Sequence, residues 1–285
     1  MYQLNLIRHG PKNNDPSLHL IPGAATLDEK ADAAIRDYIK QFAKSLPSNA
    51  TIGLYTTIVK RAMQTADIAH DEFNRLGFSV SSPQVDSIGS YVNDNGTERN
   101  LSSHLMSLEW QKGKDAEWKA GTYARGINKE DLPMMLWCEK GFDNPQYSGL
   151  NLPDYDSGIS LREIAARVGD YILQRITNQK GKDADLVIQH SGDIEPWLIL
   201  TLAMISGHDS TQPGYMQRML PKIGGGLNPL TGIKIIDTGS DLYLEHPTQN
   251  GTSSFPLPGA ILLEQSEWTN TNGIADKVIE QRRAV

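Results

Sequence analysis

Three consecutive residues near the amino end of the sequence, Arg8, His9 and Gly10, could perform chemistry on a phosphate group. The planar guanidinium group matches phosphate oxygens and stays charged at any working pH. An imidazole beside it can attack phosphorus and carry the phosphoryl group covalently. Glycine lets the backbone approach the anion closely. Because the apolar residues 4–7 precede the tripeptide, we expect it at the end of a strand, although a chance tripeptide in a surface turn is the alternative.

A second arginine, Arg61, lies at a position suited to an anion. The apolar residues 50–55 predict a strand, and Thr56 or Thr57 stands where a helix N-cap belongs. Apolar residues then recur at steps of four and three, which is typical of an amphipathic helix over 61–76. The first turn of a helix gathers backbone N–H groups and the positive end of the helix dipole. The alternative is a solvated pair formed by this arginine and its basic neighbour.

A second histidine, His190, follows another short apolar segment, residues 185–189. Open α/β sheets bind ligands at the carboxyl ends of their strands. Two histidines that both follow buried-type strands, one of them beside an arginine, therefore predict a single site at one edge of a sheet.

These segments resemble the histidine phosphatase superfamily, which includes phosphoglycerate mutases and many phosphatases. The matching blocks occur in the family's order and near its usual separations. They are residues 6–10, 56–66, 158–163 and 187–190, and residues 25–30 fit the start of the family's first helix. The resemblance implies that His9 is the nucleophile that becomes phosphohistidine. It further implies that Arg8, Arg61 and His190 bind the phosphoryl oxygens.

Physical chemistry agrees with these implied roles. Charge on a transferring phosphoryl group is spread over its oxygens, so catalysis consists mostly of positioning and cationic stabilisation. Two guanidinium groups and an imidazolium can supply that charge, so we expect neither a metal nor another cofactor. A bound dianion would raise the pKa of His190. To attack, His9 must offer an unprotonated ring nitrogen, so its other nitrogen should donate to a backbone carbonyl.

The general acid is where the sequence departs from the family, whose mutase-like members use a glutamate to protonate the leaving oxygen. The corresponding stretch, 86–96, contains no glutamate, and the next one is Glu98. Asp94 is the first candidate because it lies in the turn-rich segment that leaves the preceding strand. Asp86, Glu98 and Asp193 are rivals, the last because an acid-phosphatase branch of the family carries an aspartate beside its second histidine. Each could equally be a solvated turn carboxylate.

Alternating strand and helix patterns predict an α/β fold with a mostly parallel sheet and helices on both faces, a three-layer sandwich like that of the phosphoglycerate mutases. Strands are predicted at 2–7, 50–55, 78–86, 185–189, 232–237, 241–245 and 260–263, and helices at 27–44, 61–76, 160–176 and 194–206. We expect one histidine phosphatase-like domain over 1–285. Residues 92–157 form a candidate cap over the site, with a plain structural insertion or an oligomer contact as alternatives.

Composition narrows the classes of partner. The net charge of −7 is spread without long runs, which argues against nucleic acid or a membrane surface as the main partner. The single cysteine, Cys138, excludes an internal disulfide and fits a reducing compartment. No signal peptide and no apolar run of membrane-spanning length is evident, so we expect a cytoplasmic protein. A small phosphorylated substrate is the expected partner, and the oligomer state is left open.

Three functions fit these residues. The first is a metal-independent phosphatase that hydrolyses a phosphomonoester of a small metabolite through phosphohistidine. The second is a phosphomutase of the phosphoglycerate type, whose charged pocket usually needs further basic residues. Lys12 and Arg99 are the main additions near the predicted site, and this small number favours the phosphatase. The third is a catalytically weak phosphate-binding or scaffold protein.

Overall fold

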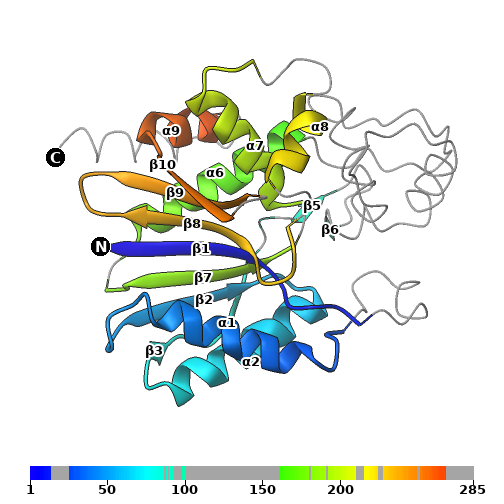
Figure 1. Cartoon of the computed structure of the whole chain (residues 1–285), viewed down its shortest axis with the longest axis vertical. Coiled ribbons are helices and arrows are strands. Elements are labelled where there is room, and N and C mark those ends of the chain that lie inside the picture. The colour runs from blue at the N-terminus through cyan, green and yellow to red at the C-terminus, as the bar shows by residue number, and fades with distance from the viewer. Residues whose placement is uncertain are drawn as a thin grey trace, which may run out of the picture.

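The computed structural model shows a mixed β-sheet with helices packed on both of its faces (Figure 1). It describes residues 1–13, 26–86, 88, 90–92, 98–100, 161–179, 181–190, 192–209, 215–223, 227–248 and 251–267. The main sheet has the order β10-β9-β8-β1-β7-β2-β3, and β4 also pairs with β2. A separate antiparallel pair joins β5 to β6. The predicted α/β class with a three-layer arrangement is confirmed.

The strands, in chain order, are β1 (Tyr2–Arg8), β2 (Thr51–Thr56), β3 (Ser79–Val80), β4 (Gln84–Val85), β5 (Ser90–Val92), β6 (Glu98–Asn100), β7 (Ala184–Gln189), β8 (Gly232–Asp237), β9 (Leu242–Thr248) and β10 (Gly251–Pro256). The helices are α1 (Ala31–Ala43), α2 (Lys60–Arg75), α6 (Leu161–Thr177), α7 (Ile194–Ile205), α8 (Tyr215–Met219) and α9 (Gly259–Glu267), and a 3-10 helix, η4, covers Leu220–Ile223. Among the described residues, no helix is both long and apolar enough to cross a membrane.

The sheet has a parallel part and an antiparallel part. Strands β1, β7, β2, β3 and β4 run parallel, so the carboxyl ends of β1, β7 and β2 meet at one edge. The register sets these ends level, because Arg8 is opposite Gln189 and Thr56 is opposite Ile188. Strands β8, β9 and β10 continue the sheet in antiparallel fashion from the other side of β1. The edge formed by β1, β7 and β2 is therefore where ligand chemistry is expected.

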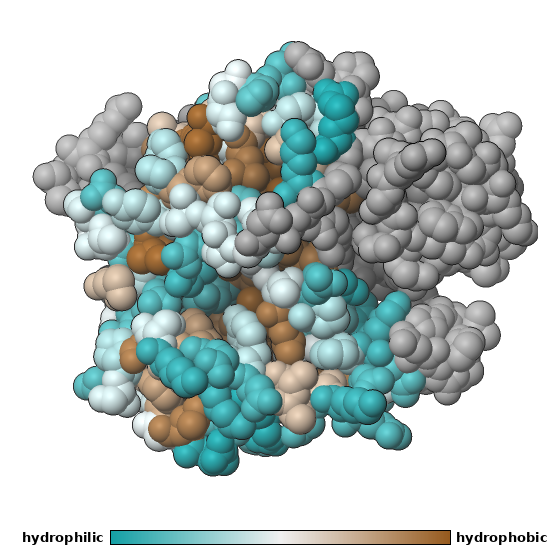
Figure 2. Space-filling model, in the orientation of Figure 1, coloured by the Kyte–Doolittle hydropathy of each residue, from teal (hydrophilic) through white to brown (hydrophobic). Residues whose placement is uncertain are grey.

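Two apolar cores fill the spaces between the sheet and its helices. Successive strand residues point to opposite faces. Thus Leu4 and Leu6 of β1 pack with α6, α7 and α9, whereas Ile7 packs with α1 and α2. The outward surface of α1 and α2 is largely hydrophilic (Figure 2). The central strands β1 and β7 are buried on both faces, and this burial includes their polar residues Gln3, Asn5 and Asp185.

The antiparallel part approaches β1 very closely at Gly232. A Cβ atom at this position would lie 1.8 Å from the carbonyl oxygen of Leu6 and 2.7 Å from the Cα atom of Ile7. Both of these atoms belong to the backbone and cannot swing aside. Only glycine therefore lets β8 begin in register beside β1.

Four predictions about elements need correction. The strand predicted over 78–86 is two short strands, β3 and β4, separated by a segment that contains Pro83, which has no N–H to donate. Residues 260–263 lie in helix α9, and the outer strand is β10. Helix α1 begins at Ala31 because residues 27–30 form a bridge and a turn. The N-cap of α2 is Val59, so neither threonine has the predicted role.

Other expectations lie outside the described residues. Among them is residue 160, the first residue of the helix predicted over 160–176. Most of the candidate cap, 92–157, also lies outside them. Within 92–157, the structure describes residue 92, which ends β5, and residues 98–100, which form β6.

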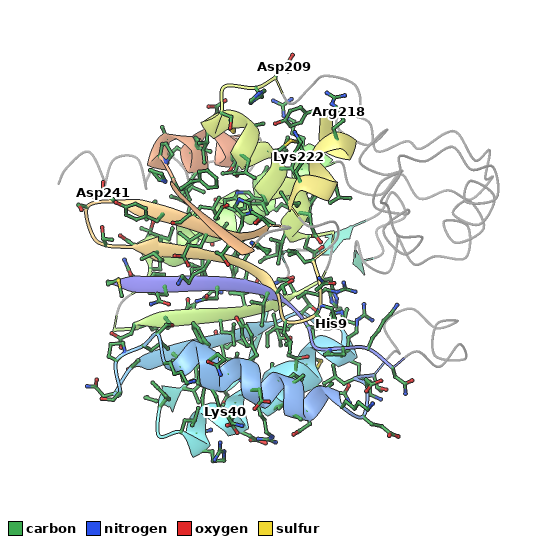
Figure 3. The ribbon with its side chains drawn as sticks, in the orientation of Figure 1. His9, Lys40, Asp209, Arg218, Lys222 and Asp241 are labelled. Atoms are coloured by element: carbon green, nitrogen blue, oxygen red, sulfur yellow. The ribbon has the colours of Figure 1, made fainter. Side chains whose placement is uncertain are left out.

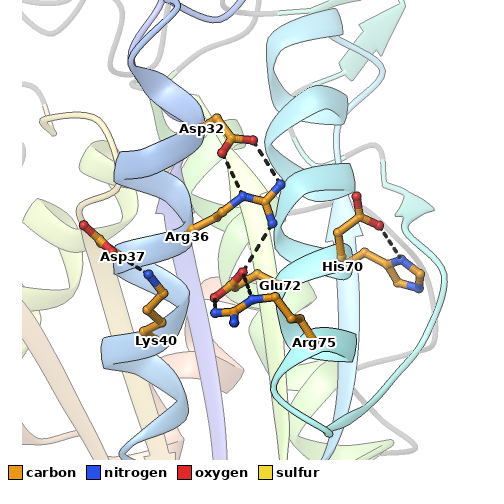
Figure 4. Close-up of polar contacts among 8 residues, drawn as sticks. Asp32, Arg36, Asp37, Lys40, His70, Glu72 and Arg75 are labelled. Carbon is orange, nitrogen blue, oxygen red and sulfur yellow. Dashed lines mark hydrogen bonds and ion pairs between the residues drawn. The ribbon is translucent and has the colours of Figure 1, made fainter.

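A network of ion pairs joins the two helices on one face of the sheet (Figure 4). The carboxylate of Glu72 on α2 is buried and accepts hydrogen bonds from Arg36 on α1 and Arg75 on its own helix. Arg36 also binds Asp32 one turn earlier. The two arginines lower the pKa of Glu72 to about 2, chiefly through the hydrogen bonds from Arg75. Glu72 is therefore ionised, and its charge is balanced by these two arginines.

Candidate active site

His9 directly follows β1 at the predicted edge of the sheet, where Figure 3 labels it. Its backbone N–H donates to the carbonyl of Gln189, the last residue of β7, at 3.0 Å. Its Nδ1 lies 2.6 Å from the carbonyl oxygen of Gly10. Because a carbonyl can only accept, Nδ1 carries the proton and Nε2 keeps its lone pair. The predicted hydrogen bond from the non-attacking nitrogen to a backbone carbonyl is confirmed.

Arg61 holds the other ring nitrogen of His9. Its Nε donates to His9 Nε2 at 2.7 Å, which agrees with an unprotonated Nε2. Burial lowers the pKa of His9 well below its usual range, and the positive charges of Arg61 and Arg8 act in the same direction. The imidazole is therefore neutral near pH 7, which is the form that can act as a nucleophile.

The guanidinium group of Arg61 reaches both histidines from the first turn of α2. Its Nη2 lies 3.4 Å from Nδ1 of His190, and the two imidazole rings have centroids 5.1 Å apart. Burial and the charge of Arg8 lower the pKa of Arg61 to about 10, so it remains a cation at neutral pH. A buried cation with a lowered pKa gains from the arrival of an anion.

His190 follows β7 and is fully surrounded. Its Nε2 lies 2.9 Å from Oγ1 of Thr57, at the carboxyl end of β2. If Arg61 donates to Nδ1, then Nε2 carries the proton and donates to that hydroxyl group. Burial and the charge of Arg61 lower the pKa of His190 well below its usual range, so the ring is neutral here. A bound dianion would act in the opposite direction, as anticipated from the sequence.

Arg8 is fixed by the loop that leads into β8. Its Nη1 donates to the carbonyl of Leu227 at 2.5 Å. Its backbone N–H donates to the carbonyl of Thr231, and its own carbonyl accepts from the N–H of Leu230. A loop more than 200 positions later in the sequence therefore sets the orientation of this arginine.

Two residues that follow Arg61 build the frame of the site. The hydroxyl oxygen of Thr65 accepts from the N–H of Gly10 at 3.0 Å and donates to the carbonyl of Arg61 at 2.7 Å. The side chain of Gln64 accepts from the N–H of Leu27 at 3.1 Å. Their place in the matching block was the only sequence signal for them. The structure thus ties the loop after β1 to α2 through side chains.

The candidate general acids have different surroundings. Asp94 lies outside the described residues, and for Glu98 only the backbone, in β6, is described. Asp86 is bound by Arg175 at 2.9 Å. Asp193 is completely buried at the start of α7, and none of the described side chains donates a hydrogen bond to its carboxyl oxygens. Burial, and next the charge of Glu195, raise the pKa of Asp193 to about 8.

Four of the predicted residues therefore meet at one edge of the sheet, namely Arg8, His9, Arg61 and His190. Sequence reasoning missed the contact between Thr57 and His190, although the position of this threonine after β2 was a usable signal. It also missed Leu227, which acts through its backbone and leaves no signal. Within the described part of the chain, no group of three or more His, Cys, Asp or Glu side chains could hold a metal ion.

No protein-family model matches the sequence, and no curated protein matches it significantly. Solved structures of phosphatases are similar to this chain along most of its length. A mycobacterial glucosyl-3-phosphoglycerate phosphatase in complex with VO3 has a TM-score of 0.48 and 12% identity, covering 88% of this chain and 100% of that chain. A putative α-ribazole-5'-P phosphatase from Escherichia coli has a TM-score of 0.43 and 14% identity, covering 90% and 96%.

A phosphoserine phosphatase from Entamoeba histolytica, in complex with phosphoserine, has a TM-score of 0.43 and 11% identity, covering 92% of this chain and 100% of that chain. Identities and TM-scores this low do not assign a function to this chain.

Proposed function

We propose that the chain is a member of the histidine phosphatase superfamily and hydrolyses a phosphomonoester of a small molecule through a phosphohistidine on His9. The observation that carries this proposal is the state of the His9 ring. Nδ1 is held by the Gly10 carbonyl, Nε2 keeps its lone pair, and a guanidinium group lies 2.7 Å from that lone pair. A neutral, oriented imidazole beside a cation is what attack on a phosphate dianion requires.

In the proposed reaction, the phosphoryl oxygens bind Arg8, Arg61 and His190. Arg61 exchanges its hydrogen bond to His9 Nε2 for one to a phosphoryl oxygen. Nε2 then attacks phosphorus, the P–N bond forms, and the P–O ester bond breaks. A carboxylic acid gives its proton to the leaving oxygen. Water next attacks phosphorus, the P–N bond breaks, and the water's proton returns to that carboxylate. The net products are an alcohol and inorganic phosphate.

For the proton donor, Asp94, Glu98 and Asp193 remain in contention, whereas Asp86 forms an ion pair with Arg175. Asp94 and Glu98 stay predictions from the sequence. Asp193 is supported by its burial, which outweighs the opposing charge of Arg61 and raises the pKa of this carboxyl group to about 8, so that it can carry a proton at neutral pH. Asp94→Asn and Asp193→Asn can be compared on aryl phosphates whose leaving groups differ in basicity. Loss of the donor should slow the substrates with the most basic leaving groups most.

The proposal is tested with an aryl phosphate assayed in EDTA, using wild type, His9→Ala and His70→Ala. His70 also lies on α2 but interacts with Asp71 and Asn74. We expect turnover in wild type and His70→Ala, none in His9→Ala, and an acid-labile phosphoprotein after rapid quenching of the wild type. Equal turnover in His9→Ala would refute the nucleophile.

The same assay separates the alternatives. Stimulation by a bisphosphorylated primer, with transfer between positions of one substrate, would indicate the phosphomutase. Phosphate binding without turnover would indicate the phosphate-binding protein. In the sequence, the stretch 86–110 offers only Arg99 and the early part of the chain mainly Lys12, and this small basic complement supports the phosphatase over the mutase.

A further inference from the structure

A buried glutamate in the first turn of α7, Glu195, contacts two loops of the site without taking part in the proposed chemistry. Its side chain is completely inaccessible to solvent. Its Oε2 accepts a hydrogen bond from the backbone N–H of Gly192 at 2.7 Å, and its Oε1 accepts one from the backbone N–H of Leu227 at 2.8 Å. A buried carboxylate is costly unless such bonds satisfy it.

The first of these loops connects His190 to α7. Gly192 has a φ of +98°, a conformation that other residues rarely adopt, and this turn presents its N–H to Glu195. The glutamate thereby fixes the segment that follows the second histidine. It does so from the helix that this segment begins.

The second loop holds Arg8. Leu227 gives its N–H to Glu195 and its carbonyl oxygen to Arg8 Nη1, so a single residue relays the contact from the carboxylate to the arginine. The loop continues to Leu230 and Thr231, which bind the backbone of Arg8. With Leu227 fixed at its N–H, its carbonyl has a defined direction.

We infer that Glu195 is a positioning residue, which orients the Arg8 guanidinium for phosphate by fixing Leu227 against the loop after His190. The inference rests on the proposed phosphate-binding role of Arg8 and extends it to a residue that does not touch the substrate. Both oxygens are needed, because two N–H donors face them. Glutamine would set its own N–H2 group against one of those donors.

The test is a double-mutant cycle read by binding of inorganic phosphate and of vanadate in isothermal titration calorimetry. The proteins are wild type, Glu195→Gln, Arg8→Ala and the double variant. We expect Glu195→Gln to weaken binding by about tenfold, the scale of one mispaired buried group. In the Arg8→Ala background the same change should weaken it by less than about twofold, because the residue it positions is gone.

The matched control is Glu72→Gln, which also removes a buried carboxylate but lies between α1 and α2. It should leave phosphate affinity unchanged. Glu195→Asp keeps both acceptor oxygens on a shorter side chain, so it should bind phosphate more tightly than Glu195→Gln. If Glu195→Gln does not fold, Glu195→Asp with and without Arg8→Ala completes the cycle.

The results distinguish failure of the role inferred for Glu195 from failure of the proposed phosphate site. Equal losses from the Glu195 change with and without Arg8 would overturn the inference, since the effect would then be a general one on stability. Wild-type affinity in Glu195→Gln would overturn it as well. A wild-type protein that binds neither anion would refute the proposed phosphate site and this inference together.

Discussion

Two pairs of arginines in this molecule differ in the groups that they contact. On the face of the sheet that α1 and α2 cover, Arg36 and Arg75 both bind the buried carboxylate of Glu72. Hydrogen bonds to carboxylates raise the pKa of both arginines. At the edge of the sheet, the contacts of Arg8 and Arg61 include a backbone carbonyl and neutral imidazoles. There, burial and the neighbouring arginine lower the pKa of Arg61 to about 10.

The raised pKa values indicate arginines whose charge stabilises the fold, and the lowered pKa of Arg61 indicates an arginine whose charge a bound anion would stabilise. A guanidinium bound to two carboxylates or a buried one gains little from a phosphate, whereas Arg61, whose pKa is lowered by burial and by Arg8, gains more from an added anion. The buried carboxyl groups repeat the contrast. The pKa of Glu72 is lowered to about 2 by its arginines, and that of Asp193 is raised to about 8 by burial and Glu195.

The largest expected effect comes from removing one arginine of each pair. Arg61→Ala should lower kcat/KM on an aryl phosphate by about 10²- to 10³-fold, because it removes a donor that acts on the phosphoryl charge. Arg36→Ala should leave kcat/KM within about twofold of wild type. Steady-state kinetics of both variants would check this, and comparable losses would contradict the distinction between the pairs.

A smaller effect, on stability alone, is expected for Glu72→Gln. It replaces a carboxylate that accepts hydrogen bonds from two arginines, so the free energy of unfolding should fall by about 1–3 kcal/mol. Urea denaturation measures this value, and kcat/KM should not change. Lys40→Ala removes an exposed ion pair with Asp37 on the same face and should cost no more than about 0.5 kcal/mol. A Glu72→Gln variant as stable as wild type would show that the network contributes nothing.

The finest test uses pH. The pKa of Asp193 is about 8 in the folded protein and about 4 when unfolded, so the folded state binds the extra proton between these values. The contribution of this group to stability is full below about pH 4 and is lost as pH rises through 8. Asp193→Asn should therefore lose less stability than wild type between pH 5 and pH 9, as measured by urea midpoints. Parallel pH profiles would show that the carboxyl group is not protonated at neutral pH.

Local pattern was enough to predict most of the fold. The strands 2–7 and 232–237 and the helix 61–76 are within about one residue of β1, β8 and α2, because each has a clear period or a continuous apolar run. The apolar run 260–263 is four residues long, and a run of that length has the same sequence pattern in a buried helix as in a strand. The break at Pro83 depends on pairing with β2, which is not a local property.

At the site, the residues with distinctive chemistry could be predicted and their supports could not. Arg8, His9, Arg61 and His190 are recognisable by type and by position after strands. The contact between Glu195 and Leu227 joins a side-chain carboxylate to a backbone N–H group 32 positions later, so nothing in the local sequence pattern marks it. Thr57 was assigned to a helix cap because that is the commoner use of a threonine before a helix.

The central place of β1 has a consequence for how the chain is made. The strand precedes both of its neighbours, β7 and β8, in the sequence, and the carbonyl that holds Arg8 comes 219 positions later. During synthesis, both edges of β1 stay unpaired until β7 and β8 have been made. A nascent chain at that stage offers a template for aggregation and a target for chaperones. The proposed phosphate site can be complete only after β8 and the loop before it have folded against β1.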